Sequence, residues 1–287
     1  MKGIYAAVLT PVDERFAPDA ARALPYYREL LGRGCDGLNL LGTTGEAMSL
    51  SVKQRVAFME AIASSGLPME RMMAGTGAAS LDDAATLTAT AFGCGFSAAL
   101  IMPPFFFRDA DDDAIFRFYA ELFARTNPPR NGVLLYNFPR MSGIAFRPTL
   151  VARLVAEFPQ AIAGMKDSSN DPELQSEILA AHRDLTMFPG SESDLLSAKR
   201  RGCAGCISGS VALWPELAQA GFRDEDETQA RQLAQRRAQL DGVPFIPAVR
   251  YLTANERSEP QWERAVPPQR GLTAEEGRAL RAQVKRG

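Results

Sequence analysis

The sequence of 287 residues has few of the side chains that build metal centres and nucleophilic triads. It contains one histidine and four cysteines, which disfavours a site with several imidazole or thiolate ligands and also a Ser-His-Asp triad. The histidine, His182, follows an apolar helical run, and we expect it at the surface near a helix C-terminus. We therefore predict no metal ion and no other cofactor.

The chain also lacks an excess of charge and a long apolar run. Its 32 basic and 34 acidic residues give a net charge of −2, which provides no electrostatic footprint for nucleic acid or an anionic membrane. No apolar run approaches the roughly 20 residues that span a membrane. The apolar run at the N-terminus is too short for a signal peptide. We expect a cytoplasmic protein with reduced cysteines.

The cysteines do not form a recognisable site. Cys203 and Cys206 make a lone C-x-x-C, a pattern found in redox and zinc sites, but no second pair completes a tetrahedral ligand set. Cys35, Cys94 and Cys203 each follow a glycine just before an apolar stretch. Small buried side chains in repeated tight turns are the simpler interpretation.

Short apolar runs alternate with amphipathic stretches along most of the chain. The runs are apolar throughout, as expected for strands that are covered on both faces. Eight of them predict strands, at 4–9, 37–42, 71–75, 98–103, 132–137, 161–166, 185–190 and 205–210. Eight βα units in a row favour a (β/α)8 TIM barrel. An open, doubly wound sheet is the alternative, although no G-x-G-x-x-G follows the first strand.

Helices are expected between these strands. Ser51 to Gln54 has the pattern of a capping box, and Ser80 is a second helix start. Further helices are expected at 111–126, 147–157, 173–181, 193–201 and 214–221, then at 224–241, 244–254 and 273–285. We therefore predict a barrel over residues 1–222 and a C-terminal helical extension over residues 223–287.

Lys166 and Tyr136 are the candidate catalytic residues. Catalytic groups in a barrel lie at the C-terminal ends of the strands, and Lys166 closes the apolar strand 161–166. A desolvated lysine favours its neutral amine, which can attack a carbonyl and form an imine. Tyr136 ends the neighbouring strand, where a phenol can serve as acid and base. A solvated surface lysine and a rim aromatic are the alternative interpretations.

Other strand ends suggest substrate-binding groups. Thr43 and Thr44 lie in a Gly-Thr-Thr-Gly turn, whose hydroxyls and backbone N–H groups suit a carboxylate. Gly190, Ser191 and Glu192 follow strand seven and offer hydroxyl and carboxylate groups. Because barrels often bind phosphate after strands seven and eight, Gly190, Ser191 and residues 208–210 also keep open a phosphate-binding isomerase.

Three motifs in order, GTTGE (42–46), YNFP (136–139) followed by Gly143, and GMKD (164–167), resemble the dihydrodipicolinate synthase and N-acetylneuraminate lyase family. The resemblance covers essentially the whole chain. It implies a class I lyase or aldolase on a barrel, usually tetrameric, that forms a Schiff base with a 2-keto acid such as pyruvate. By this resemblance Lys166 forms the Schiff base and Tyr136 is the acid and base. Thr43 and Thr44 bind the carboxylate, and Gly190 and Ile207 line the pocket.

Two departures from the synthase pattern indicate a subfamily. Met141 occupies the position where that branch has an arginine for a second carboxylate, and the arginine here, Arg140, comes one residue early. Phe106 replaces a tyrosine that relays protons between subunits in that branch. We therefore expect pyruvate release from a 2-keto-3-deoxy sugar acid or a sialic-acid-like substrate. The alternatives are 4-hydroxy-tetrahydrodipicolinate synthase, a keto-deoxy sugar acid dehydratase and a non-catalytic sensor.

The loop after strand four predicts assembly. Phe105, Phe106 and Phe107 are followed by Arg108 and an acidic stretch, and three aromatic rings cannot all face inward from one loop. Exposed apolar patches of this kind mark interfaces. We expect a homo-oligomer, a dimer or tetramer, with Phe106 across the interface. A hydrophobic lid over the loop's own barrel is the alternative.

Overall fold

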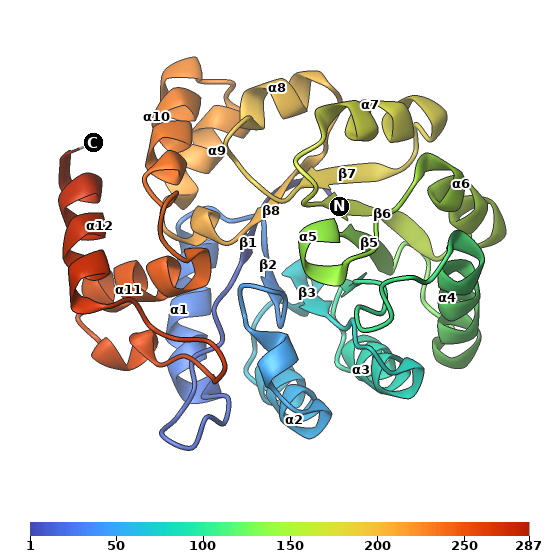
Figure 1. The fold of residues 1–287 in the computed structure, drawn as a ribbon, viewed down its shortest axis with the longest axis horizontal. Coiled ribbons are helices and arrows are strands. Elements are labelled where there is room, and N and C mark those ends of the chain that lie inside the picture. Colours follow the sequence, from blue (N-terminus) through green and yellow to red (C-terminus); the bar gives the residue numbers. More distant parts are fainter. Residues whose placement is uncertain (287) are drawn as a thin grey trace.

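The structure is a computed structural model that describes residues 1–286. Figure 1 shows a ring of strands enclosed by helices. The strands are β1 (Gly3–Ala7), β2 (Gly37–Leu40), β3 (Met72–Gly75), β4 (Ala98–Ile101), β5 (Val133–Asn137), β6 (Ile162–Asp167), β7 (Thr186–Pro189) and β8 (Gly205–Ser208). Each coincides with an apolar run that predicted a strand.

The eight strands form one sheet in the order β7-β6-β5-β4-β3-β2-β1-β8. Every ladder between neighbours is parallel. The two ends of the sheet meet where Ala204 N, just before β8, donates a hydrogen bond of 2.8 Å to Met187 O of β7. The fold is therefore the predicted TIM barrel and not the open doubly wound sheet.

Most helices connect the strands and cover the outside of the barrel, and those that follow β8 connect no strands (Figure 1). They are α1 (Ala20–Gly32), α2 (Val52–Ala63), α3 (Leu81–Gly93), α4 (Asp112–Thr126), α5 (Pro139–Ser142), α6 (Pro148–Glu157), α7 (Pro172–Ala181), α8 (Leu195–Arg200), α9 (Pro215–Arg223), α10 (Glu227–Ala238), α11 (Phe245–Arg257) and α12 (Ala274–Arg286). The predicted capping box at Ser51 is present, and Ser80 caps α3. The sequence prediction did not include α1 or the short helix α5.

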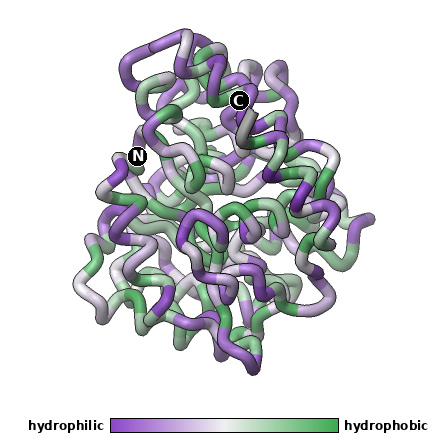
Figure 2. Tube along the Cα trace, turned by 90° about the vertical axis from the view of Figure 1, so that its left-hand side faces the viewer, coloured by the Kyte–Doolittle hydropathy of each residue, from purple (hydrophilic) through white to green (hydrophobic). Residues whose placement is uncertain are grey.

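The core has two parts because side chains alternate along each strand. One set packs between the sheet and the helices, as Met165 of β6 does. The other fills the barrel interior and includes Tyr5, Met73, Phe188 and Ile207. Figure 2 shows the hydrophobic chain segments running through the body of the molecule, with many hydrophilic turns at its edges. The barrel interior is therefore a packed core and not a pore, and a ligand of the barrel binds at its mouth.

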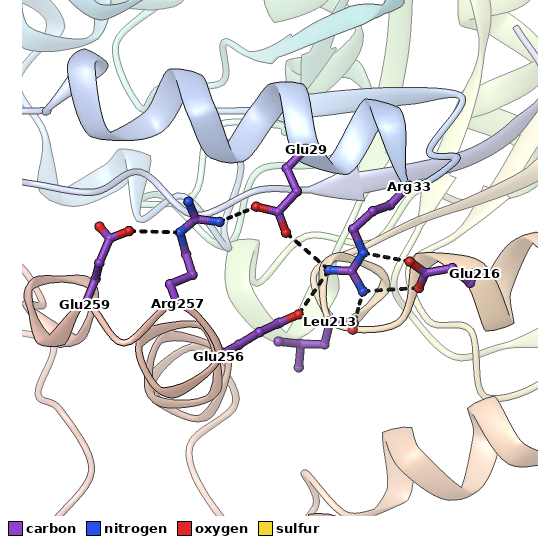
Figure 3. A network of polar contacts seen from close by, with 7 residues as sticks. All are labelled: Glu29, Arg33, Leu213, Glu216, Glu256, Arg257 and Glu259. Carbon is purple, nitrogen blue, oxygen red and sulfur yellow. Dashed lines mark hydrogen bonds and ion pairs between the residues drawn. The ribbon is translucent and has the colours of Figure 1, made fainter.

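The helices that follow α9 lie on one side of the barrel, and ion pairs hold α11 against it (Figure 3). Arg33, which caps the C-terminus of α1, contacts Glu256 of α11 at 3.2 Å and Glu216 of α9 at 2.7 Å. Arg257 of α11 pairs with Glu29 of α1. This network fixes α11 relative to the first and last helices of the barrel. None of the helices within residues 1–286 is long and apolar enough to cross a membrane.

Candidate active site

Lys166 and Tyr136 face each other at the mouth of the barrel. The parallel register of β5 and β6 pairs Tyr136 directly with Lys166. Lys166 Nζ donates a hydrogen bond of 3.2 Å to the Tyr136 hydroxyl and lies 4.3 Å from the centre of the same ring. Both side chains are buried, with exposed fractions of 5% and 3%. The amine is thus shielded from bulk water and next to a group that can exchange protons with it.

Thr43 extends this contact to a third residue. Its Oγ1 lies 3.2 Å from the Tyr136 hydroxyl, in a hydrogen bond for which either oxygen can be the donor. Thr43 comes from the loop after β2, on the other side of the barrel mouth from β5 and β6. The phenol therefore connects the lysine to the Gly-Thr-Thr-Gly turn. A substrate bound between them would have an amine, a phenol and a hydroxyl within reach.

Asp167, the residue after Lys166, forms hydrogen bonds that fix the end of β6 and does not pair with the lysine. Its carboxylate is buried and accepts hydrogen bonds from Asn137 Nδ2 at 2.7 Å, Ser169 Oγ at 2.9 Å and Gln175 Nε2 at 2.8 Å. Asn137 in turn accepts from the backbone N–H of Phe146. Within residues 1–286, Lys166 forms no ion pair with a carboxylate. The network fixes the ends of β5 and β6 and leaves the amine free of a direct counterion.

A cavity of about 740 Å³ opens above the lysine. It is lined by Thr43, Thr44, Tyr136, Met141, Lys166, Gly190 and Ser191, all predicted to act in catalysis or substrate binding. Further polar residues line it as well: Ser168, Ser169, Asn170, Ser193 and Gln175. The cavity is much larger than a three-carbon keto acid needs. Its wall offers polar groups to the rest of a longer substrate.

Residue 190 must be a glycine because Ser168, in the loop after β6, lies very close to its backbone. A Cβ atom at residue 190 would lie 2.0 Å from the hydroxyl oxygen of Ser168. No side chain fits there unless the loop after β6 moves. The missing side chain keeps β6 and β7 close together at the base of the cavity.

Two predicted substrate-binding residues do not line the cavity. Ile207 is fully buried in the barrel interior because its side chain points inward from β8, into the cluster that also contains Phe188. Glu192 is fully buried too, and neither of its carboxylate oxygens has a hydrogen-bond partner among the described residues. The loop after β7 instead presents Ser191, Ser193 and Asp194 to the cavity.

Part of the wall comes from residues that the sequence did not single out. Arg237 of α10, Phe245 at the start of α11 and Gln269 line the cavity, and so does Arg201, which caps the C-terminus of α8. Arg201 pairs with Asp194 at 2.8 Å, and Arg237 pairs with Asp241 at 3.0 Å. No local pattern signals Arg237, Phe245 and Gln269, because they reach the mouth only through the docking of the extension.

The three aromatic rings in the loop after β4 do not all face inward, as the sequence predicted. Phe105 packs against the barrel interior, whereas Phe106 and Phe107 are 76% and 72% exposed and stack edge to face at 5.2 Å. Neither exposed ring lines the cavity. The loop is held at Arg108, whose side chain lies against Gly143 after α5. In the single chain, the two rings therefore form an uncovered apolar patch close to the YNFP segment.

The cysteines and the histidine lie apart from the site. Cys35, Cys203 and Cys206 are buried and free, in agreement with the core interpretation, whereas Cys94 is only half-buried because it caps the C-terminus of α3. Burial raises the pKa of Cys203 to about 11 and that of Cys35 to about 12. His182 is half-buried and caps the C-terminus of α7. No group of three or more metal-binding side chains occurs in the described part of the chain.

Comparison with known proteins places the chain in a family. The model of the dihydrodipicolinate synthetase family matches residues 1–252. An uncharacterized DapA-like lyase of Chloroflexus aurantiacus is 33% identical over 243 residues, which cover 84% of this chain and 80% of that protein. A 4-hydroxy-tetrahydrodipicolinate synthase of Thermus thermophilus is 33% identical over 208 residues, which cover 70% of this chain and 67% of that protein.

The three-dimensional comparison agrees. The crystal structure of dihydrodipicolinate synthase from Agrobacterium tumefaciens superposes with a TM-score of 0.93 at 28% identity and covers 100% of this chain and 99% of that one. The resemblance drawn from the three sequence motifs is thus confirmed over the length of the chain. The protein belongs to the dihydrodipicolinate synthetase family of pyruvate-dependent lyases and aldolases.

Proposed function

We propose that this enzyme releases pyruvate from a 2-keto-3-deoxy sugar acid or a sialic-acid-like substrate through a Schiff base on Lys166. One observation carries the proposal: a buried amine, a phenol and a threonine hydroxyl form a continuous chain from Lys166 to Tyr136 to Thr43 at the base of the cavity. Each has a separate task in imine chemistry. Together they supply the nucleophile, the proton carrier and part of the carboxylate site.

The reaction begins at the C2 ketone of the substrate. The Lys166 amine adds to this carbon, and loss of water from the carbinolamine leaves a protonated imine. Tyr136 donates the proton that allows the carbinolamine oxygen to leave as water. Thr43 and Thr44 hold the substrate carboxylate next to the new bond, with hydroxyls and backbone N–H groups.

Carbon–carbon cleavage uses the imine as an electron sink. Tyr136, now a phenolate, removes the proton from the C4 hydroxyl, the C3–C4 bond breaks, and an aldehyde leaves. The bonding electrons form an enamine with the three-carbon fragment on Lys166. Protonation of the enamine at C3 and hydrolysis of the imine release pyruvate and restore the free amine.

The wall of the cavity supports a polyhydroxylated substrate. Ser168, Ser169, Ser191 and Ser193 offer hydroxyl groups along the side nearest β6 and β7. Met141, which is 45% exposed, stands at the rim where a synthase would place its arginine. With Phe106 in place of a tyrosine, the subunit-crossing proton relay of that branch is absent. These features favour a sugar acid over aspartate semialdehyde as the partner of pyruvate.

The synthase remains the second candidate, because a relative named 4-hydroxy-tetrahydrodipicolinate synthase is 33% identical to this chain over 208 aligned residues. A dehydratase that uses the same imine is the third. A screen of 2-keto-3-deoxy acids for pyruvate release, with aspartate semialdehyde condensation measured beside it, separates them. Condensation with aspartate semialdehyde and no pyruvate release from any sugar acid would reject the sugar-acid substrate.

We further propose that the active form is a cytoplasmic homo-oligomer in which Phe106 packs against a second copy. The exposed pair Phe106 and Phe107 supports this proposal, because contiguous apolar surface of this kind marks interfaces. A loop that instead closes as a lid over its own cavity would leave the protein monomeric. Sedimentation of the wild-type protein distinguishes the two.

A further inference from the structure

A buried ion pair joins the loop after β2 to helix α11. Arg250 is 1% exposed and Glu46 is 5% exposed. Arg250 Nε donates to Glu46 Oε2 at 2.6 Å, and its Nη2 contacts the same oxygen. The guanidinium also donates to the backbone carbonyls of Thr10 at 3.1 Å and Trp262 at 3.2 Å. One side chain of the extension thus fixes three segments that are distant in sequence.

Glu46 is the last residue of GTTGE, the motif that contains the two candidate carboxylate-binding threonines. Its backbone has a φ of +51°, and Leu41, just before the motif, has a φ of +52°. Residues other than glycine rarely adopt these left-handed values. The loop therefore needs an external contact that favours this conformation. The Arg250 pair at one end of the motif is such a contact.

Helix α11 also packs close to the second threonine. A Cβ atom on Gly209, in the loop after β8, would lie 2.8 Å from Thr44 Oγ1 and 3.0 Å from the ring of Phe245. Thr44, Gly209 and Phe245 are therefore packed around one point on the cavity wall. The outer face of α11 is held independently by the ion pairs with α1 (Figure 3). A helix fixed on both sides is a rigid support for the loop.

We infer that the Glu46–Arg250 pair positions Thr43 and Thr44 for the carboxylate of the keto acid. This inference rests on the proposed function, in which the two threonines bind that group. Neither Glu46 nor Arg250 lines the cavity, so both are positioning residues that act through the loop. Through Arg250, the C-terminal extension thereby sets the affinity for the carboxylate with a side chain that does not line the cavity.

The test separates carboxylate binding from imine formation. Borohydride trapping is measured against concentration for two ketones, pyruvate and its methyl ester, which lacks the charged carboxylate. Glu46→Gln keeps the shape of the side chain but removes the charge that holds Arg250. We expect its half-saturating pyruvate concentration to rise about tenfold, the effect of one weakened charged hydrogen bond. The limiting trapping rate and the response to the ester should stay within about twofold of wild type, well below that effect.

Arg250→Lys provides a second variant if Glu46→Gln does not fold. It keeps the positive charge beside Glu46 but loses the fork that reaches Thr10 and Trp262, and the same selective loss of pyruvate affinity is expected. Glu256→Gln is the matched control, because Glu256 pairs with Arg33 on the outer face of α11. Because Arg257 still pairs with Glu29 on that face, half-saturation with pyruvate and with the ester should both stay as in the wild type.

Two results would overturn the inference. A folded Glu46→Gln or Arg250→Lys variant with unchanged half-saturation for pyruvate would show that the loop does not depend on the pair. Equal losses with pyruvate and with the ester would make the pair a general structural element. Failure of the proposed function is distinguishable from both, because wild-type protein would then trap neither ketone on Lys166.

Discussion

Replacing Tyr136 with phenylalanine removes one oxygen atom from the centre of the site. That oxygen accepts the hydrogen bond from Lys166 Nζ and contacts Thr43 Oγ1, each at 3.2 Å. The ring itself is 3% exposed and packs in the barrel interior, so phenylalanine preserves its shape. The substitution therefore tests the proton-carrying role of the hydroxyl and leaves the packing role in place.

The substitution should lower the stability of the protein slightly and its reaction rate greatly. Two hydrogen bonds, each worth a net of about 0.5–1.5 kcal/mol, give a decrease of about 1–3 kcal/mol in the free energy of unfolding. In a chain of this size this lowers Tm by only a few degrees. General acid–base catalysis typically contributes about 10²–10⁴ in rate, and we expect kcat to fall by that factor while the fold is intact.

Deuterium exchange provides an assay that does not require the unknown aldehyde. A class I lyase that forms an enamine with pyruvate exchanges the methyl protons of pyruvate with D2O, and NMR follows this exchange directly. Circular dichroism and thermal melting serve as controls for folding. An exchange rate and a kcat within about twofold of wild type, far below the range for acid–base catalysis, would refute the role of Tyr136 and make it a packing residue.

Two further predictions concern assembly and the cysteines. Phe106→Asp should convert the oligomer to smaller species in sedimentation, because a charge buried in a subunit contact strongly weakens association. Phe16→Asp, at a different exposed phenylalanine, is the control, and an unchanged oligomer in Phe106→Asp would favour the lid. For the cysteines, burial raises the pKa of Cys35 to about 12 and of Cys203 to about 11, so both stay as unreactive thiols at about pH 8. A thiol reagent should therefore modify only the half-buried Cys94 in the folded enzyme, and rapid modification of Cys203 or Cys206 would contradict the core assignment.

Much of the barrel could be predicted because its signal is local. Each strand is a short apolar run covered on both faces, and each run coincides with an observed strand. The errors in the strands lie at their ends: the run 205–210 extends past β8, since Ser210 already begins a 3-10 helix, and the run 4–9 extends two residues beyond β1. Helix α5 was missed because only four residues form it, between Phe138 and the left-handed Gly143.

In the candidate active site, too, some contacts could be predicted from the sequence and others could not. The contact between Lys166 and Tyr136 could be predicted because consecutive barrel strands are neighbours, so the ends of β5 and β6 meet. Arg250 and Glu46 could not, because 204 residues separate them and no periodicity links a glutamate in a loop to an arginine in a terminal helix. Glu192 illustrates a different limit. The motif placed a carboxylate after β7, but only the packing shows that it is buried and that its serine neighbours reach the cavity.

The central claim is that Lys166 forms a Schiff base with a 2-keto acid, and peptide mass spectrometry after pyruvate and borohydride treatment tests it most directly. We predict one added reduced pyruvyl group, located on Lys166, and no addition in Lys166→Ala. Unmodified wild-type protein would contradict the claim, and so would modification at Lys53 or Lys199 in place of Lys166.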